Sequence, residues 1–195
     1  MIIEPVILYG KIIKLVPLQK SYVLELAEAG DDEEIWKYMP YGPIVTIEKM
    51  TDLIDHLLTL QDHKTDLPFA VIYQKSSKAI GMTRYLEIEP ANQALEIGGT
   101  WYALDYQHTA VNTECKFLLL RHAFEDLNCI RVQFKTDLRN ERSQRALERI
   151  GAVKEGVLRD HMILPDGTIR SSVYYSILAR EWPLVRQRLI SLMNR

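Results

Sequence analysis

Apolar positions recur along the chain with two periods, one typical of helices and one of strands. Between residues 46 and 61, apolar residues recur every three or four positions, which predicts an amphipathic helix. Residues 69–73 are continuously apolar, which predicts a buried strand. The same criteria predict further helices at 21–29, 113–126, 141–150 and after Pro183, and further strands at 11–16, 79–87, 95–102, 130–136, 153–164 and 169–179.

The order of these elements predicts a mixed α/β (α+β) fold in one domain that covers residues 1–195. The crossover from 95–102 through 113–126 to 130–136 must join parallel strands if the two strands are neighbours in the sheet. The last two strands form a hairpin across 165–167, which reads Pro-Asp-Gly, a strong turn signal. No repeat, low-complexity segment or linker divides the chain.

The strand at 95–102 separates two sets of side chains. Strict alternation places Glu96 and Thr100 on one face and Ile97 and Trp101 on the other. Glu96 can therefore point away from the core, where a solvated glutamate with no function is the simple alternative to a catalytic one.

The composition narrows the functional classes. Hydrophobic residues make up 47% of the chain and charged residues 26%, which excludes a disordered or fibrous protein. The net charge of -2 gives no basic field, so we expect no nucleic-acid and no membrane partner. The chain has neither a signal-peptide pattern nor a membrane-spanning apolar run, so we expect a cytoplasmic protein. Cys115 and Cys129 lack CxxC spacing, so we expect two reduced thiols and no metal site.

Two segments could carry chemistry. In 101–114 a strand leads into an apolar helix, whose first N–H groups and positive dipole end can bind a phosphate, although an ordinary connector has the same features. In 134–152, Asn140 and Ser143 lie one helical turn apart, so their side chains can project to the same side. The structural alternative is that Asn140 only caps a helix that Gly151 ends, and that Ser143 only contacts the cap.

Together with the C-terminal segments, these motifs resemble the GNAT (Gcn5-related N-acetyltransferase) superfamily, and within it the branch that includes the ribosomal-protein N-terminal acetyltransferases. The resemblance is carried by the order of the segments 140–143, 151–152, 155–159, 166–167, 174–178 and 181–183. It implies a mixed, mostly antiparallel sheet of six to seven strands, with splayed central parallel strands and helices on both faces. It also implies acetyl-CoA-dependent transfer to a primary amine, on a protein N-terminus or a small molecule, and homodimerisation, which is common in the family.

The loop that binds pyrophosphate in this family reads Gln/Arg-x-x-Gly-x-Gly/Ala, and the chain has Gln107, Ala110 and Asn112 at the corresponding positions. Only Gln107 matches. A positive φ at Ala110 would be costly, because a side chain disfavours that conformation. The alternative to an active enzyme is therefore a non-catalytic acyl-CoA-binding module.

The resemblance also implies which residues hold the cofactor. An oxyanion would be bound by a backbone N–H near 97–101. The implied cofactor-binding residues are Ile97, Thr100, Trp101, Gln107, His108, Thr109, Ala110, Val111, Asn112, Thr113, Asn140 and Ser143.

The catalytic base is expected at Glu96, with Asp160 and His161 as alternatives, and Ser143 is expected to protonate or orient the leaving sulfur. The acceptor region is expected within 31–41, where acids could attract a cationic amine or could simply favour the dipole of a helix start. The substrate residues predicted there and on a later strand are Glu34, Trp36, Tyr38, Tyr41 and His161.

Overall fold

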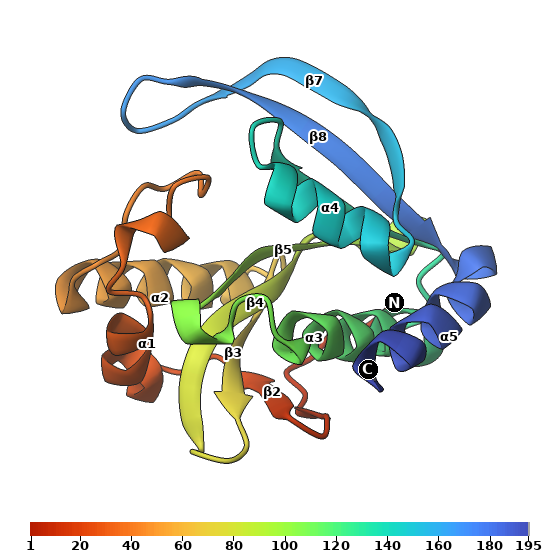
Figure 1. The fold of residues 1–195 in the computed structure, drawn as a ribbon, viewed down its shortest axis with the longest axis horizontal. Coiled ribbons are helices and arrows are strands. Elements are labelled where there is room, and N and C mark those ends of the chain that lie inside the picture. Colours follow the sequence, from red (N-terminus) through yellow and green to blue (C-terminus); the bar gives the residue numbers. More distant parts are fainter. Residues whose placement is uncertain (195) are drawn as a thin grey trace.

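An eight-stranded sheet runs through the computed structural model of the protein, which describes residues 1–194 (Figure 1). The strands are ordered β1-β2-β3-β4-β5-β6-β8-β7, and within the described residues only β5 and β6 are parallel neighbours. This confirms the mixed, mostly antiparallel sheet. The short edge strand β1 is additional to the six to seven strands that were predicted. The strands are β1 Leu8–Tyr9, β2 Ile13–Pro17, β3 Leu67–Tyr73, β4 Lys78–Glu89, β5 Ala94–Tyr102, β6 Arg131–Asp137, β7 Val153–Ile163 and β8 Ile169–Leu178.

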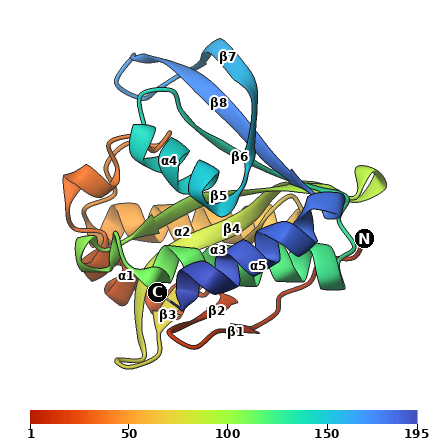
Figure 2. The ribbon, with the colours of Figure 1, turned by 45° about the vertical axis from the view of Figure 1, so that its right-hand side comes forward.

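Helices cover both faces of the sheet. Helices α1 and α2 pack on one face, over a core cluster that includes Trp36 and Trp101. Helices α3 and α5 lie side by side on the other face, over a cluster that includes Ile97 and Phe134 (Figure 2). The helices are α1 Val23–Ala29, α2 Ile47–Asp62, α3 Ala110–Arg121, α4 Glu141–Ile150 and α5 Trp182–Met193.

The start of α3 differs from the predicted boundary. The helix begins at Ala110 rather than at 113, and a π-helical turn, His122–Asp126, continues it. Cys115 and Cys129 are buried free thiols, as predicted. Within residues 1–194, no helix is long and apolar enough to cross a membrane.

Strand β5 contains a bulge that changes which residues share a face. Met82 of β4 pairs with Trp101, whereas Arg84 pairs with Gly98, so β5 has one extra residue over this interval. Gly99 lies within the bulge and has a φ of +57°, a conformation that glycine adopts without steric cost. Trp101 therefore packs on the α1–α2 face, opposite Ile97, and Thr100 faces α3, where Lys116 contacts it. The predicted shared faces, Ile97 with Trp101 and Glu96 with Thr100, are both wrong.

The parallel strands β5 and β6 pair over only three positions. The last pair is Glu96 with Gln133. Beyond it, β5 continues along β4 and β6 continues along β8, as far as Asp137 opposite Ser172. The strands therefore separate toward their carboxyl ends, which confirms the splayed central strands of the predicted fold.

Helix α4 follows β6 and lies beneath the long β7–β8 hairpin (Figure 1). Its ends match the prediction: the Asn140 side chain accepts a hydrogen bond from the Ser143 N–H, and Gly151 ends the helix with a φ of +100°. These local bonds fix where the helix begins beside the separated strands.

Glu114 ties α3 to the N-terminal segment. Its carboxylate, 4% exposed, accepts hydrogen bonds from the backbone N–H groups of Lys11, Ile12 and Ile13 at 2.7, 2.8 and 2.8 Å. Hydrogen bonds to a charged acceptor are stronger than neutral ones, so this contact holds α3 firmly against the β2 side of the sheet.

We predict that Glu114→Gln lowers the free energy of unfolding by about 2 kcal/mol, because one buried and two partly buried N–H groups lose a charged acceptor. Urea denaturation measures the change. The control is Glu141→Gln, whose carboxylate pairs with Arg145 on the exposed surface of α4, and it should change the free energy by less than about 0.5 kcal/mol. Equal effects of the two substitutions would contradict the anchoring role.

Candidate active site

A cavity of about 720 Å³ lies where β5 and β6 separate. Its walls come from β5, β6, the start of α3, α4 and the loop around residues 38–41. A second hollow, of about 480 Å³, lies at the other end of these strands and contains no predicted site residue. The separated strands therefore form the larger opening, and the predicted chemistry lies there.

The loop before α3 offers unpaired backbone donors to this cavity. The Thr109 side chain caps the helix by accepting a hydrogen bond from the Val111 N–H. Within the described residues, the backbone N–H groups of His108, Thr109 and Ala110 have no acceptor. N–H groups of this kind at the start of a twelve-residue helix form an anion-binding site.

The positive φ in this loop falls on His108 (+60°) and not on Ala110, which is the first residue of the helix. The steric cost that a positive φ would have at Ala110 is therefore absent. The substitution of the family's first glycine leaves the amides of the loop in place.

Helix α4 reaches the α3 side of the cavity through two arginines. Arg142 donates to the Gln107 side-chain oxygen at 2.6 Å, and Arg149 donates to the Thr113 hydroxyl at 2.9 Å. Arg145 lines the same region. These cations supply a local positive field that the net charge of the whole chain does not reveal.

Nine of the twelve residues predicted to bind the cofactor line the cavity. Val111 is instead a core residue, 2% exposed, and Thr113 is buried and engaged by Arg149. Ala110 contributes backbone rather than a lining side chain. The nine that line it are Ile97, Thr100, Trp101, Gln107, His108, Thr109, Asn112, Asn140 and Ser143.

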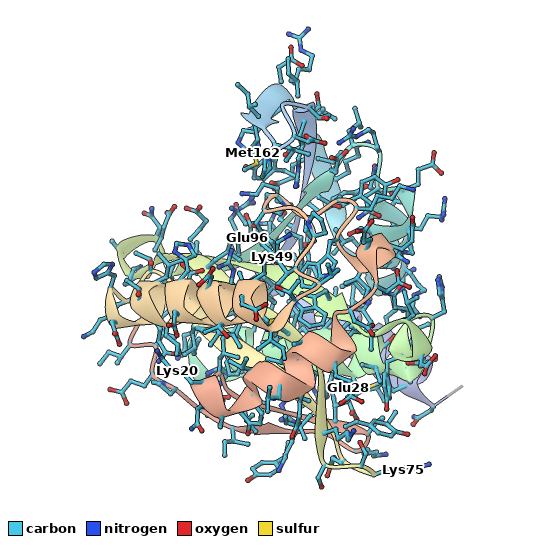
Figure 3. All side chains as sticks on the ribbon, turned by 90° about the vertical axis from the view of Figure 1, so that its left-hand side faces the viewer. Lys20, Glu28, Lys49, Lys75, Glu96 and Met162 are labelled. Carbon is cyan, nitrogen blue, oxygen red and sulfur yellow. The ribbon has the colours of Figure 1, made fainter. Side chains whose placement is uncertain are left out.

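Glu96 lines the cavity from the α1–α2 face of β5, and Figure 3 shows it below the hairpin that carries Met162. Glu96 is only 2% exposed, so the alternative of a solvated glutamate that points into solvent is wrong. Gln133 donates to its carboxylate at 3.1 Å, and the Lys135 Nζ lies 3.7 Å away. Burial raises the pKa of Glu96, and Lys135 offsets this only in part.

The alternatives to Glu96 as the base lie outside the cavity. Asp160 is exposed, in an irregular part of β7, with a φ of +50°. The His161 ring lies 3.0 Å from the Ser172 hydroxyl and packs edge-on against Tyr174. His161 is nevertheless close to two of the cations near Glu96, because burial and the charges of Lys135 and Arg170 lower its pKa, and Arg170 donates to the same Ser172 hydroxyl.

The predicted acceptor residues divide into two groups. Tyr38 and Tyr41 line the cavity. Glu34 does not, because its side chain is 73% exposed. Its N–H donates to the Asp32 carboxylate. This contact favours the alternative that the acids here only stabilise the start of a helix. Trp36 is a core residue, 1% exposed, and donates to the Gly30 carbonyl.

Sequence reasoning missed the cationic residues that line the cavity, which are four further side chains besides the three arginines of α4. Arg84, Lys135 and Arg170 lie near Glu96. Arg170 also donates to the Tyr38 carbonyl, so it joins β8 to the loop around residues 38–41. Lys116 enters from α3. The available signal for Lys116 was its position one helical turn after Asn112.

Known proteins were compared with the chain. The family model described as "Acetyltransferase (GNAT) domain" matches residues 13–153. The chain therefore belongs to the GNAT acetyltransferase family.

Individual relatives agree with this assignment. The chain is 35% identical over 102 residues to a Bacillus subtilis (strain 168) protein named "Putative ribosomal N-acetyltransferase YdaF", a match that covers 52% of the chain and 55% of that protein. It is 27% identical to "Uncharacterized N-acetyltransferase p20" of Bacillus licheniformis, over 80% of the chain and 87% of that protein. A solved GCN5-related N-acetyltransferase from Brucella melitensis is 29% identical to the chain, with a TM-score of 0.90. The match spans 97% of this chain and 86% of that structure.

For this GNAT protein we predict that Glu96→Gln raises the thermal unfolding midpoint at about pH 8. Burial raises the folded-state pKa of Glu96 above its unfolded value, so the carboxylate penalises the folded state once the pH exceeds the folded pKa. Below the unfolded pKa, about 4.3, both states are protonated and the penalty is absent.

The difference between variant and wild type should therefore shrink as the pH falls from about 8 to about 4. Thermal unfolding across this range measures it. A variant less stable than the wild type at about pH 8 would show that Lys135 and Gln133 stabilise the carboxylate more than burial penalises it.

Proposed function

We propose that this GNAT N-acetyltransferase transfers an acetyl group from acetyl-CoA directly to a primary amine, on a protein N-terminus or a small molecule. The observation that carries the proposal is the cavity of about 720 Å³ where β5 and β6 separate, which has free helix-start amides on one side and the buried Glu96 on the other.

The residues present fit a CoA thioester. The amides of His108, Thr109 and Ala110 and the side chains of Arg142 and Arg149 suit its phosphates. The edge of β5 that β6 leaves beyond Glu96 offers backbone groups to an extended ligand that carries amides. When bound, acetyl-CoA supplies an activated acyl group.

On the other side, Glu96 is the base that makes the acceptor amine nucleophilic. Attack requires a neutral amine, and a carboxylate whose pKa is raised by burial is a better proton acceptor than an ordinary glutamate. Tyr38 and Tyr41 form the wall beside which the acceptor would lie. Two buried donors of residues that line the cavity, the Trp101 Nε1 and the Arg84 Nε, have no hydrogen-bond partner in the described residues.

The transfer itself forms a carbon–nitrogen bond and breaks the carbon–sulfur bond. A backbone N–H within 97–101 would hold the carbonyl oxygen as it becomes negative, because the Gly99 bulge leaves this part of β5 irregular and facing the cavity. Ser143 lines the cavity from the first turn of α4 and would orient the sulfur.

The name of the Bacillus subtilis relative supports a ribosomal protein as the first acceptor to test. A small-molecule amine is the second choice, and homodimerisation stays a prediction.

We predict that acetyl-CoA raises the thermal unfolding midpoint of the wild-type protein and that thiol is released with at least one member of a panel of N-terminal peptides and small amines. Glu96→Gln should bind acetyl-CoA unchanged but turn over on the order of 10²- to 10⁴-fold more slowly, because the amine loses its base. Glu28→Gln on α1, whose carboxylate pairs with Lys78 on the exposed surface away from the cavity, serves as the matched control.

Three outcomes would contradict the proposal in different ways. No stabilisation by acetyl-CoA would reject the donor. Stabilisation without turnover on the whole panel would favour the non-catalytic binding module. A loss confined to Asp160→Asn would move the base from Glu96 to β7.

A further inference from the structure

Lys116 is a buried amine on the α3 side of the cavity. It is 6% exposed and lines the cavity one helical turn after Asn112. Its Nζ donates a hydrogen bond to the Thr100 Oγ1 at 2.9 Å, and that oxygen lies 2.8 Å from the Thr83 Oγ1. Two hydroxyls from β4 and β5 thus fix the position of the amine.

The surroundings of this amine leave its charge uncompensated. Among residues 1–194, no carboxylate forms an ion pair with the Lys116 Nζ, and the Phe134 ring centroid lies 5.8 Å from it. Burial lowers the pKa of Lys116. The adjacent Cys115 offsets this only in part, because burial raises the pKa of that thiol.

The contact with Thr100 places this cation beside the reacting atoms of the proposed function. The carbonyl of the thioester is expected against the backbone of 97–101, and Thr100 belongs to that stretch. An unpaired buried cation is costly in the resting protein. Negative charge that develops on the oxygen or sulfur of the thioester relieves this cost, so the cation favours the transition state over the ground state.

We propose that Lys116 is a further catalytic residue, whose ammonium donates a proton to the thiolate that leaves the acyl carbon. The acceptor nitrogen bonds to the acyl carbon, the carbon–sulfur bond breaks, and the sulfur takes the electron pair of that bond and a proton from Nζ. The proton that the acceptor amine loses returns through solvent to the neutral Lys116. The inference rests on the proposed function, and it leaves Ser143 to orient the sulfur, because a serine hydroxyl is a much weaker acid than an ammonium.

The test uses CoA, the product thiol, and needs no acceptor. The pKa of the bound thiol is measured from the ultraviolet absorbance of its thiolate during a pH titration of the complex, with the same titration without CoA subtracted. We expect the thiol to be at least about tenfold less acidic in Lys116→Met than in the wild type, because an opposite charge a few ångströms away lowers a pKa by about one unit or more. Lys116→Arg keeps the charge and should keep the acidic thiol.

A purely structural role gives a different result. Methionine fills a similar volume without a buried charge, so Lys116→Met should be at least as stable as the wild type in thermal unfolding. With an acceptor from the panel, its kcat should fall at least about tenfold at saturating acetyl-CoA, while the Kd of CoA changes little. Lower stability accompanied by an unchanged thiol pKa would assign Lys116 to the fold alone.

Failures of this inference and of the proposed function are distinguishable. A wild-type protein that binds no CoA rejects the proposed function, and the inference with it. CoA binding with equal thiol pKa values in wild type and Lys116→Met rejects only the inference. An acetyl group found on Lys116 by peptide mass after incubation with acetyl-CoA also rejects it, because the amine would then be an acyl acceptor rather than an acid.

Discussion

The early end of the pairing between β5 and β6 is the constraint on which the rest of the site depends. After the pair of Glu96 and Gln133, each strand keeps only its other neighbour. Backbone donors and acceptors inside a protein need partners, so the free edges favour a ligand that carries its own amide groups. The cavity, the helix-start amides and the position of α4 all follow from this separation.

The sheet also keeps two buried charges apart. Glu96 projects from the α1–α2 face, whereas Lys116 comes from α3 on the opposite face. In direct contact they would neutralise each other as an ion pair. Separated by the sheet, Glu96 keeps a pKa that burial raises despite Lys135, which suits it to a proton from an amine, and Lys116 lacks a carboxylate partner among residues 1–194, which suits it to a developing negative charge.

Signals confined to a few residues allowed the most reliable predictions. Asn140 and Gly151 fix both ends of α4 through bonds to nearby backbone, so its bounds could be predicted from the sequence. The face of Trp101 could not, because one extra residue at the Gly99 bulge reverses the alternation. The burial of Lys116 was also invisible, since a helical lysine is usually solvated and this one is covered by strands distant in the sequence.

Backbone amide hydrogen exchange with and without CoA tests most directly whether the separated strands β5 and β6 bind the acyl donor. If the separated strands form the acyl-donor site, CoA slows exchange at His108, Thr109 and Ala110, because it supplies the acceptors that these amides lack. It also slows exchange along 97–101, because it covers the free edge of β5. Unchanged exchange at both segments, with protection elsewhere on the chain, would contradict the central claim that the separated strands form the acyl-donor site.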